Sequence, residues 1–142
     1  MTPEFLSAVV DTLLPGDAAT PPLPSGTEVG IAERLAEHVV ASRDRARHDA
    51  VLHAIADAAR GEDAFVRADA AERISSVKRV EAEMGEPFRA FVSLLLQDYY
   101  ETDAVLVAIG SRAEPPQPDG HVIAPFDETL LDPVRRRGPM WR

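Results

Sequence analysis

Apolar residues recur through most of the first 110 residues at the three- and four-residue spacing of amphipathic helices. The clearest stripe begins after Gly85-Glu86-Pro87 and consists of Phe88, Phe91, Val92, Leu95 and Tyr99. Leu94 and Leu96 widen this stripe, so we expect the helix to be covered on more than one side. The earlier helices are then expected to pack against it.

A proline-rich loop separates the first two predicted helices. The first helix starts at Thr2-Pro3, where a capping hydroxyl precedes a proline suited to the first helical position, and it ends at Pro15-Gly16-Asp17. Residues 15–26 hold four of the 12 prolines, which predicts a loop of polyproline character rather than a packed element. Ser25-Gly26-Thr27-Glu28 fits a capping box for the second helix, with Thr27 as the alternative cap.

Two more helices are expected before Gly85. One starts near Ser42 or Asp44 and closes at Gly61. The other starts at a second capping-box spacing, over residues 69–72, and runs to Gly85. Both carry apolar residues at helical spacing toward the expected core.

Two stretches allow more than one assignment. Residues 62–68 either anchor a turn or extend the helix that follows them. Thr102 or Asp103 can cap a last helix that ends at Gly110, although the apolar residues from Val105 to Ile109 also alternate as in a strand. We favour the helix because no partner strand is expected elsewhere.

The composition changes after Gly110. Residues 115–120 are typical of extended chain followed by a turn, and residues 128–134 of a single helical turn. We therefore expect an all-α domain over residues 1–110, with five to six helices in an orthogonal or bundle-like arrangement. An extended proline-rich C-terminal arm over residues 111–142 is expected to follow.

Charge is distributed unevenly along the chain. The net charge is −9, and four of the 15 basic residues lie in residues 135–142, so residues 1–134 hold 11 basic and 24 acidic groups, a balance of −13. Such an acidic body repels nucleic acid and anionic lipid. No apolar run approaches the roughly 20 residues of a membrane helix. We therefore expect neither nucleic-acid binding nor membrane insertion.

No residue pattern predicts a catalytic, cofactor or metal site. His48 and His53 are five residues apart, about 140° around a helix, whereas two metal ligands on one face need a spacing of three or four. His38 lies among charged residues typical of an exposed helix face. No serine lies in a nucleophile elbow, and the chain has no cysteine, which excludes disulfides and thiolate chemistry.

Two groups of residues are candidates for binding a partner protein. Tyr99 and Tyr100 are adjacent and lie about 100° apart on a helix. One of them therefore continues the core stripe, and the other can join an interface, where tyrosine is enriched. Arg137, Trp141 and Arg142 are of the types that dominate binding hot spots, and Trp141 is the only tryptophan. These tail residues either dock on another chain or fold back on the acidic body.

Short motifs spread along the chain give it a family resemblance. They are Asp11-Thr12-Leu13-Leu14-Pro15-Gly16-Asp17, Val29-Gly30-Ile31, Pro87-Phe88-Arg89, Leu95-Leu96-Gln97-Asp98-Tyr99-Tyr100, Ile109-Gly110, Pro115-Pro116-Gln117-Pro118-Asp119-Gly120, and Arg137-Gly138 with a final Arg142. With these motifs the sequence resembles the gluconate 2-dehydrogenase subunit 3 family, the small subunits of flavin-dependent sugar and polyol dehydrogenases. The resemblance spans most of the chain.

The resemblance implies a largely helical, non-catalytic subunit that binds no cofactor itself. Its partner would be a large FAD-containing oxidoreductase of the glucose–methanol–choline type, acting on sugars, sugar acids or glycosides. The small subunit would stabilise this partner in a hetero-oligomer. Members of the family often carry a twin-arginine signal that exports the pair. This sequence shows none, so we expect a cytoplasmic complex, with export on a partner's signal as the alternative.

The runner-up hypothesis is a homodimeric helical module for binding or regulation, without a flavoprotein partner and with the tail folded on its own surface. A small enzyme using histidine or carboxylate chemistry is disfavoured because no set of residues meets the spacing tests. We therefore expect an accessory subunit rather than an enzyme. Its expected partner contacts are Tyr99, Tyr100, Arg137, Trp141 and Arg142.

Overall fold

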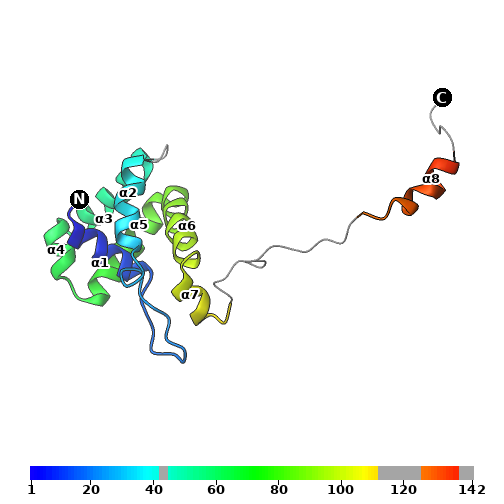
Figure 1. Ribbon diagram of the computed structural model, residues 1–142. Helices are drawn as coiled ribbons and strands as arrows, with labels where there is room; N and C mark the ends of the chain where they lie inside the picture. Colours follow the sequence, from blue (N-terminus) through cyan, green and yellow to red (C-terminus); the bar gives the residue numbers. More distant parts are fainter. Residues whose placement is uncertain (42–44, 112–125, 138–142) are drawn as a thin grey trace.

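The computed structural model describes residues 1–41, 45–111 and 126–137 (Figure 1). Every regular element in these ranges is helical, which confirms the predicted all-α class. The elements up to residue 111 are α1 (Pro3–Leu13), α2 (Ile31–Ala41), α3 (Arg45–Ala58), α4 (Glu62–Arg67), α5 (Ala70–Met84), α6 (Glu86–Tyr100) and α7 (Asp103–Ala108). The 3-10 helix η1 (Glu128–Leu131) and α8 (Asp132–Arg136) follow.

The first helix forms as its sequence predicts. The Oγ1 atom of Thr2 accepts a hydrogen bond from the backbone N–H of Phe5 at 3.3 Å, and Pro3 occupies the first helical turn. Phe5 and Val9 on the inner face are fully buried. The helix packs on α2, α4 and α5, so it closes one side of the core.

The predicted central stripe on α6 is confirmed by burial. Phe91 and Leu95 are fully buried, and the helix contacts α2, α3, α5 and α7. Leu94 is half-buried, but Leu96 is 37% exposed, so the expectation that Leu96 widens a covered stripe is wrong. The reason is geometric, because Leu96 lies about 100° around the helix from Leu95 and leaves the covered face.

The start of α2 differs from the prediction. The expected capping box does form, since the Ser25 N–H donates to Glu28 Oε2 at 2.7 Å and the Glu28 N–H donates to Ser25 Oγ at 3.3 Å. It closes a turn over residues 27–30, and the helix begins only at Ile31. Gly30 separates the two, because its φ of +77° is a left-handed conformation that a continuous helix does not contain.

Residues 62–68, which the sequence left between two assignments, form a helix of their own. The six residues of α4 are held by tertiary contacts, with Phe65 fully buried and its ring edge-on to that of Phe5 at 5.5 Å. The preceding helix α3 ends at Ala58 rather than at Gly61. Its expected starting residues Ser42 and Asp44 lie outside the described ranges.

The remaining predicted helices are confirmed. Asp69 and Glu72 form a reciprocal capping box at the start of α5. A helix rather than a strand follows α6, and Thr102 occupies its cap position, although the Thr102 hydroxyl donates to the carbonyl oxygen of Tyr99 instead. The helical turn expected over residues 128–134 is present and extends to Arg136. Within the described ranges, no helix combines the length and apolar character needed to cross a bilayer.

Candidate partner interface

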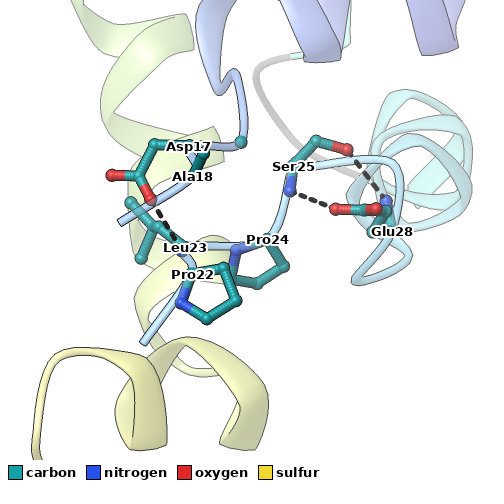
Figure 2. A pocket seen from close by; sticks show the side chains of 8 residues that line it. Asp17, Ala18, Pro22, Leu23, Pro24, Ser25 and Glu28 are labelled. Atoms are coloured by element: carbon teal, nitrogen blue, oxygen red, sulfur yellow. Dashed lines mark hydrogen bonds between the residues drawn. The ribbon is translucent and has the colours of Figure 1, made fainter. Parts of the chain in front are cut away.

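The proline-rich loop between α1 and α2 folds around the carboxylate of Asp17 (Figure 2). Its Oδ1 atom accepts hydrogen bonds from the backbone N–H groups of Leu23, at 2.9 Å, and Ala19, at 3.0 Å. The Asp17 N–H donates to the carbonyl oxygen of Leu23 at 2.9 Å. The two N–H donors, Leu23 first, hold the pKa of Asp17 below its ordinary value, because they stabilise the charged form. The loop therefore has a defined conformation.

The end of the loop is tied to α1. The Gly26 N–H donates to the carbonyl oxygen of Leu14 at 2.9 Å, and the Thr27 N–H donates to Asp11 Oδ1 at 3.0 Å. Gly26 packs so closely that a Cβ atom there would lie 2.5 Å from Cγ1 of Val10. Glycine is required by this approach of backbone to helix. The first of the quoted motifs, from Asp11 to Asp17, thus begins and ends with carboxylates that position the loop.

Tyr99 on α6 fixes the other side of the loop. Its hydroxyl donates to the carbonyl oxygen of Pro24 at 2.5 Å, and its side chain is buried. Burial raises the pKa of Tyr99 above its ordinary value, and Tyr100, Asp17 and Glu28 raise it further, because a tyrosinate near other negative charges is disfavoured. Tyr99 acts here as a structural clamp between a helix and a loop distant in sequence.

An open hollow of about 680 Å³ lies within the loop (Figure 2). It is lined by Gly16, Asp17, Ala18, Pro22, Leu23, Pro24, Ser25 and Glu28. Proline rings and a leucine side chain stand beside the carboxylates of Asp17 and Glu28. A surface of this kind suits an apolar side chain of a partner protein that has a basic neighbour.

Tyr100 points away from the core, next to the clamp. It is 48% exposed whereas Tyr99 is 3% exposed, which confirms that one tyrosine continues the core stripe and the other leaves it. The two rings meet edge-on at 5.5 Å. Three further large apolar side chains are exposed on α6 and the adjoining α7: Leu96, Val107 and Ile109. Val107 and Ile109, the C-cap of α7, are two residues apart and so point to different sides. We call these three side chains and Tyr100 together the α6–α7 apolar surface.

Of the three tail candidates, only Arg137 lies within the described residues. Arg137 follows α8 and is exposed. Trp141 and Arg142 lie outside the described residues. The contact of all three with a partner stays a prediction.

The structure reveals a contact between a histidine and a carboxylate that the sequence did not predict, and this contact is an ion pair when the imidazole is protonated. The His38 Nε2 atom on α2 lies 2.9 Å from Oδ2 of Asp98 on α6, and Asp98 is only 7% exposed. A guanidinium N–H of Arg34 also donates to the Asp98 carbonyl oxygen at 3.3 Å. The sequence did contain a signal for this contact. Asp98 follows Leu95 by three residues and thus falls on the buried stripe, where a carboxylate needs a partner.

The remaining histidines of α3 do not form a site. His48 is buried with its ring 6.0 Å from that of Phe91, and its Nδ1 atom has no hydrogen-bond partner in the described part of the chain. His53 is exposed. Among the described residues, no three His, Asp or Glu side chains come together in a way that could hold a metal ion.

Comparison with known families identifies the relatives of this chain. Residues 2–109 match the sequence model of the family described as gluconate 2-dehydrogenase subunit 3. The chain belongs to this family. The predicted resemblance is thereby confirmed, and the match contains the proline loop, Tyr99, Tyr100 and α7, whereas the C-terminal arm lies beyond it. No curated protein and no solved structure matches the chain.

Family membership makes the chain one of a group of dehydrogenase subunits, for which an accessory role in a hetero-oligomeric complex is the expected one. The matched residues are those of the helical body. The proline loop and the α6–α7 apolar surface lie within the match and are the candidates for contacts with a partner.

Proposed function

We propose that the chain is a non-catalytic accessory subunit that binds and stabilises a large FAD-dependent oxidoreductase of the glucose–methanol–choline type. The substrates of that partner are proposed to be sugars or glycosides, and FAD is held by the partner rather than by this chain. The observation that carries the proposal is the family match over residues 2–109, because the family is described as a dehydrogenase subunit.

The exposed apolar side chains of α6 and α7 support a protein partner. Tyr100 and Leu96 are four residues apart and so share one face of α6. Burying one large apolar side chain in an interface contributes about 1.5–3 kcal/mol before the costs of association. Tyrosine is also among the residue types that dominate hot spots. We propose this surface as the centre of the interface.

The acidic loop supports a partner surface with basic groups. Asp17 and Glu28 line the hollow beside the tyrosine clamp, on a body whose balance of charges is −13 over residues 1–134. Complementary charge speeds encounter and favours one register of docking, and its effect falls with salt. Arg137, Trp141 and Arg142 are proposed as additional anchors, reaching the partner from the arm.

Mild affinity purification of the tagged chain from its own host tests the proposal. We expect a yellow complex with flavin absorbance bands and a second, much larger polypeptide of the oxidoreductase class. A colourless homodimer of this chain alone would contradict the proposal and support a helical binding module instead. We propose the cytoplasm as the compartment, and fractionation of the same cells tests it, with recovery of the complex outside the cytoplasm as the contrary result.

A further inference from the structure

A groove lies between α1, α2 and α3, on elements other than the α6–α7 apolar surface. Two adjoining hollows, of about 390 and 410 Å³, form it and share Met1, Leu6 and Ala36 in their linings. Leu6 and Leu52 are buried at its base, whereas Met1 and Ala36 are exposed. The first hollow is mainly apolar, whereas the second is of mixed character, with Arg45, Asp49 and His53 in its lining.

Acidic side chains border this groove. Glu33 and Glu37, one turn apart on α2, are exposed and line the first hollow. Asp49 on α3 lines the second hollow, and its Oδ2 atom lies 3.6 Å from Nε of Arg45. The rim on the α2 side is thus negative, and it favours an occupant that carries positive charge next to apolar side chains.

The chain itself contains a segment with exposed apolar side chains and a basic end. Residues 126–136, which we call the arm segment, comprise η1 and α8 preceded by Phe126 and Asp127. Phe126 and Leu130 are 66% and 67% exposed, and the segment ends in Arg135 and Arg136, which are also exposed. Asp127, Glu128 and Asp132 precede these arginines, so the positive charge is confined to the end of the segment. Asp127 Oδ1 accepts a hydrogen bond from the Thr129 N–H at 2.9 Å, so the helical start is already formed.

We propose that the arm segment docks in the groove of its own chain. It binds as a short amphipathic segment, with Phe126, which precedes η1, and Leu130 covering the apolar part of the groove. The basic end meets the acidic rim, where Arg135 and Arg136 lie near the two glutamates of α2. The fit combines apolar contacts with opposite charge at one end of the segment, and both halves are present on one polypeptide.

The length of the connection favours the chain's own groove over that of a second copy. Residues 112–125 separate the body from the arm segment, and a stretch of that length spans up to about 50 Å. A body of this size is roughly 35 Å across. The connection therefore reaches those faces of the body to which the path over its surface is shorter than about 50 Å, and a tether that spans the distance holds the segment at an effective concentration of about a millimolar.

This inference goes beyond the proposed function, because the docking needs no flavoprotein. It also concerns the part of the chain that lies outside the family match. The docked segment ends at Arg136, immediately before Arg137, the first of the proposed tail anchors. The arm segment thereby sets where the proposed tail anchors begin.

A paramagnetic label on the arm segment tests the docking. The chain has no cysteine, so Glu128→Cys gives one attachment point for a nitroxide, at an exposed position. We expect the amide signals of Ala36 and Leu52 in the isotope-labelled full chain to lose intensity and to regain it when the nitroxide is reduced. Signals of α5 residues are expected to keep their intensity.

Two variants and one control distinguish specific docking from random encounters. Leu130→Asp in the arm segment, and the double reversal Glu33→Lys with Glu37→Lys, are each expected to abolish the intensity loss at the groove. The matched control, Glu81→Lys with Glu83→Lys, makes the same change of net charge on exposed positions of α5 and is expected to preserve it. Circular dichroism checks that each variant keeps its helices.

Three results would overturn the proposal. One is full intensity at the groove in the unmodified labelled chain, and another is loss of intensity at a different face. The third comes from mixing isotope-labelled chain without nitroxide and nitroxide-labelled chain without isotope. If the groove signals weaken in this mixture as strongly as in the single labelled chain, the occupant is a second copy rather than the chain's own arm.

Discussion

The hydroxyl group of Tyr99 donates a 2.5 Å hydrogen bond to the carbonyl oxygen of Pro24, 75 residues earlier in the chain. The bond joins the end of α6 to a loop that Asp17 folds from within. Tyr100, the next residue after Tyr99, is exposed, and the centres of the two rings are 5.5 Å apart. We infer that the conformation of the loop and the presentation of Tyr100 depend on the same buried clamp.

Replacing Tyr99 with phenylalanine tests the clamp. Tyr99→Phe keeps the ring in the core but removes the hydrogen bond to Pro24, so we expect a loss of about 0.5–1.5 kcal/mol in the free energy of unfolding. Urea denaturation measures the loss, and amide hydrogen exchange of residues 16–26 shows whether the loop opens. Tyr100→Phe is the matched control, expected to change neither. Equal effects of the two variants would contradict a specific role for Tyr99.

The clamp also predicts a decrease of stability at alkaline pH. Burial raises the pKa of Tyr99 in the folded state above the value of about 10 in the unfolded chain. The folded state then binds this proton more tightly, so stability present below about pH 10 is lost as the pH rises through the raised pKa. Thermal unfolding measured from pH 9 upward is expected to show a steeper decline for the unmodified chain than for Tyr99→Phe. Identical slopes would contradict the assignment.

The ion pair between α2 and α6 predicts a small coupling energy. His38 is partly exposed, so the interaction of its imidazole with Asp98 is screened by solvent, and we expect about 0.2–1 kcal/mol. A double-mutant cycle of His38→Ala and Asp98→Asn measures it. The control cycle pairs Asp98→Asn with His53→Ala on the exposed face of α3. Coupling of similar size in both cycles would refute a direct pair.

The α6–α7 apolar surface predicts where partner affinity is lost. Tyr100→Ala is expected to weaken binding of the flavoprotein by about 1–2 kcal/mol, or roughly 5–30-fold, because a partly exposed aromatic anchor is removed. Ile74→Ala on α5, where the side chain is 44% exposed, is the control and is expected to bind normally. Titration of the purified flavoprotein with each variant gives the affinities. An unchanged affinity of the Tyr100→Ala variant for the flavoprotein would show that the interface lies elsewhere.

The tail anchors predict a separable loss of affinity. Removing residues 137–142, which leaves Arg135 and Arg136 of the arm segment in place, is expected to weaken the complex while the helical content of the body, followed by circular dichroism, stays intact. The deletion removes all of the proposed tail anchors, Arg137, Trp141 and Arg142. Unchanged affinity for the flavoprotein would contradict the proposal that the tail is an anchor.

Much of the fold follows from local sequence signals. Thr2 and Pro3 start α1, and the spacing of Asp69 and Glu72 starts α5, because these residues satisfy backbone groups that are free at every helix start. The same chemistry was misleading at Ser25 and Glu28, where the reciprocal bonds form but close a turn. A capping pattern alone does not say how far a helix continues beyond it.

Features that depend on tertiary contacts were not predictable in the same way. The helix α4 has only six residues and is held in place by the packing of Phe65 on Phe5. The contact of Tyr99 with Pro24 joins positions that no local pattern relates. Asp98 is different, since its position on the buried stripe was visible and only its partner His38 needed the structure.

Native mass spectrometry of the affinity-purified complex tests the central claim most directly. We predict one species containing this 15.4 kDa chain and a larger polypeptide with one bound FAD. On gentle dissociation, the small chain is expected to leave without flavin while the large polypeptide retains it. A species made of two copies of this chain, with no flavin and no second polypeptide, would contradict the accessory-subunit proposal.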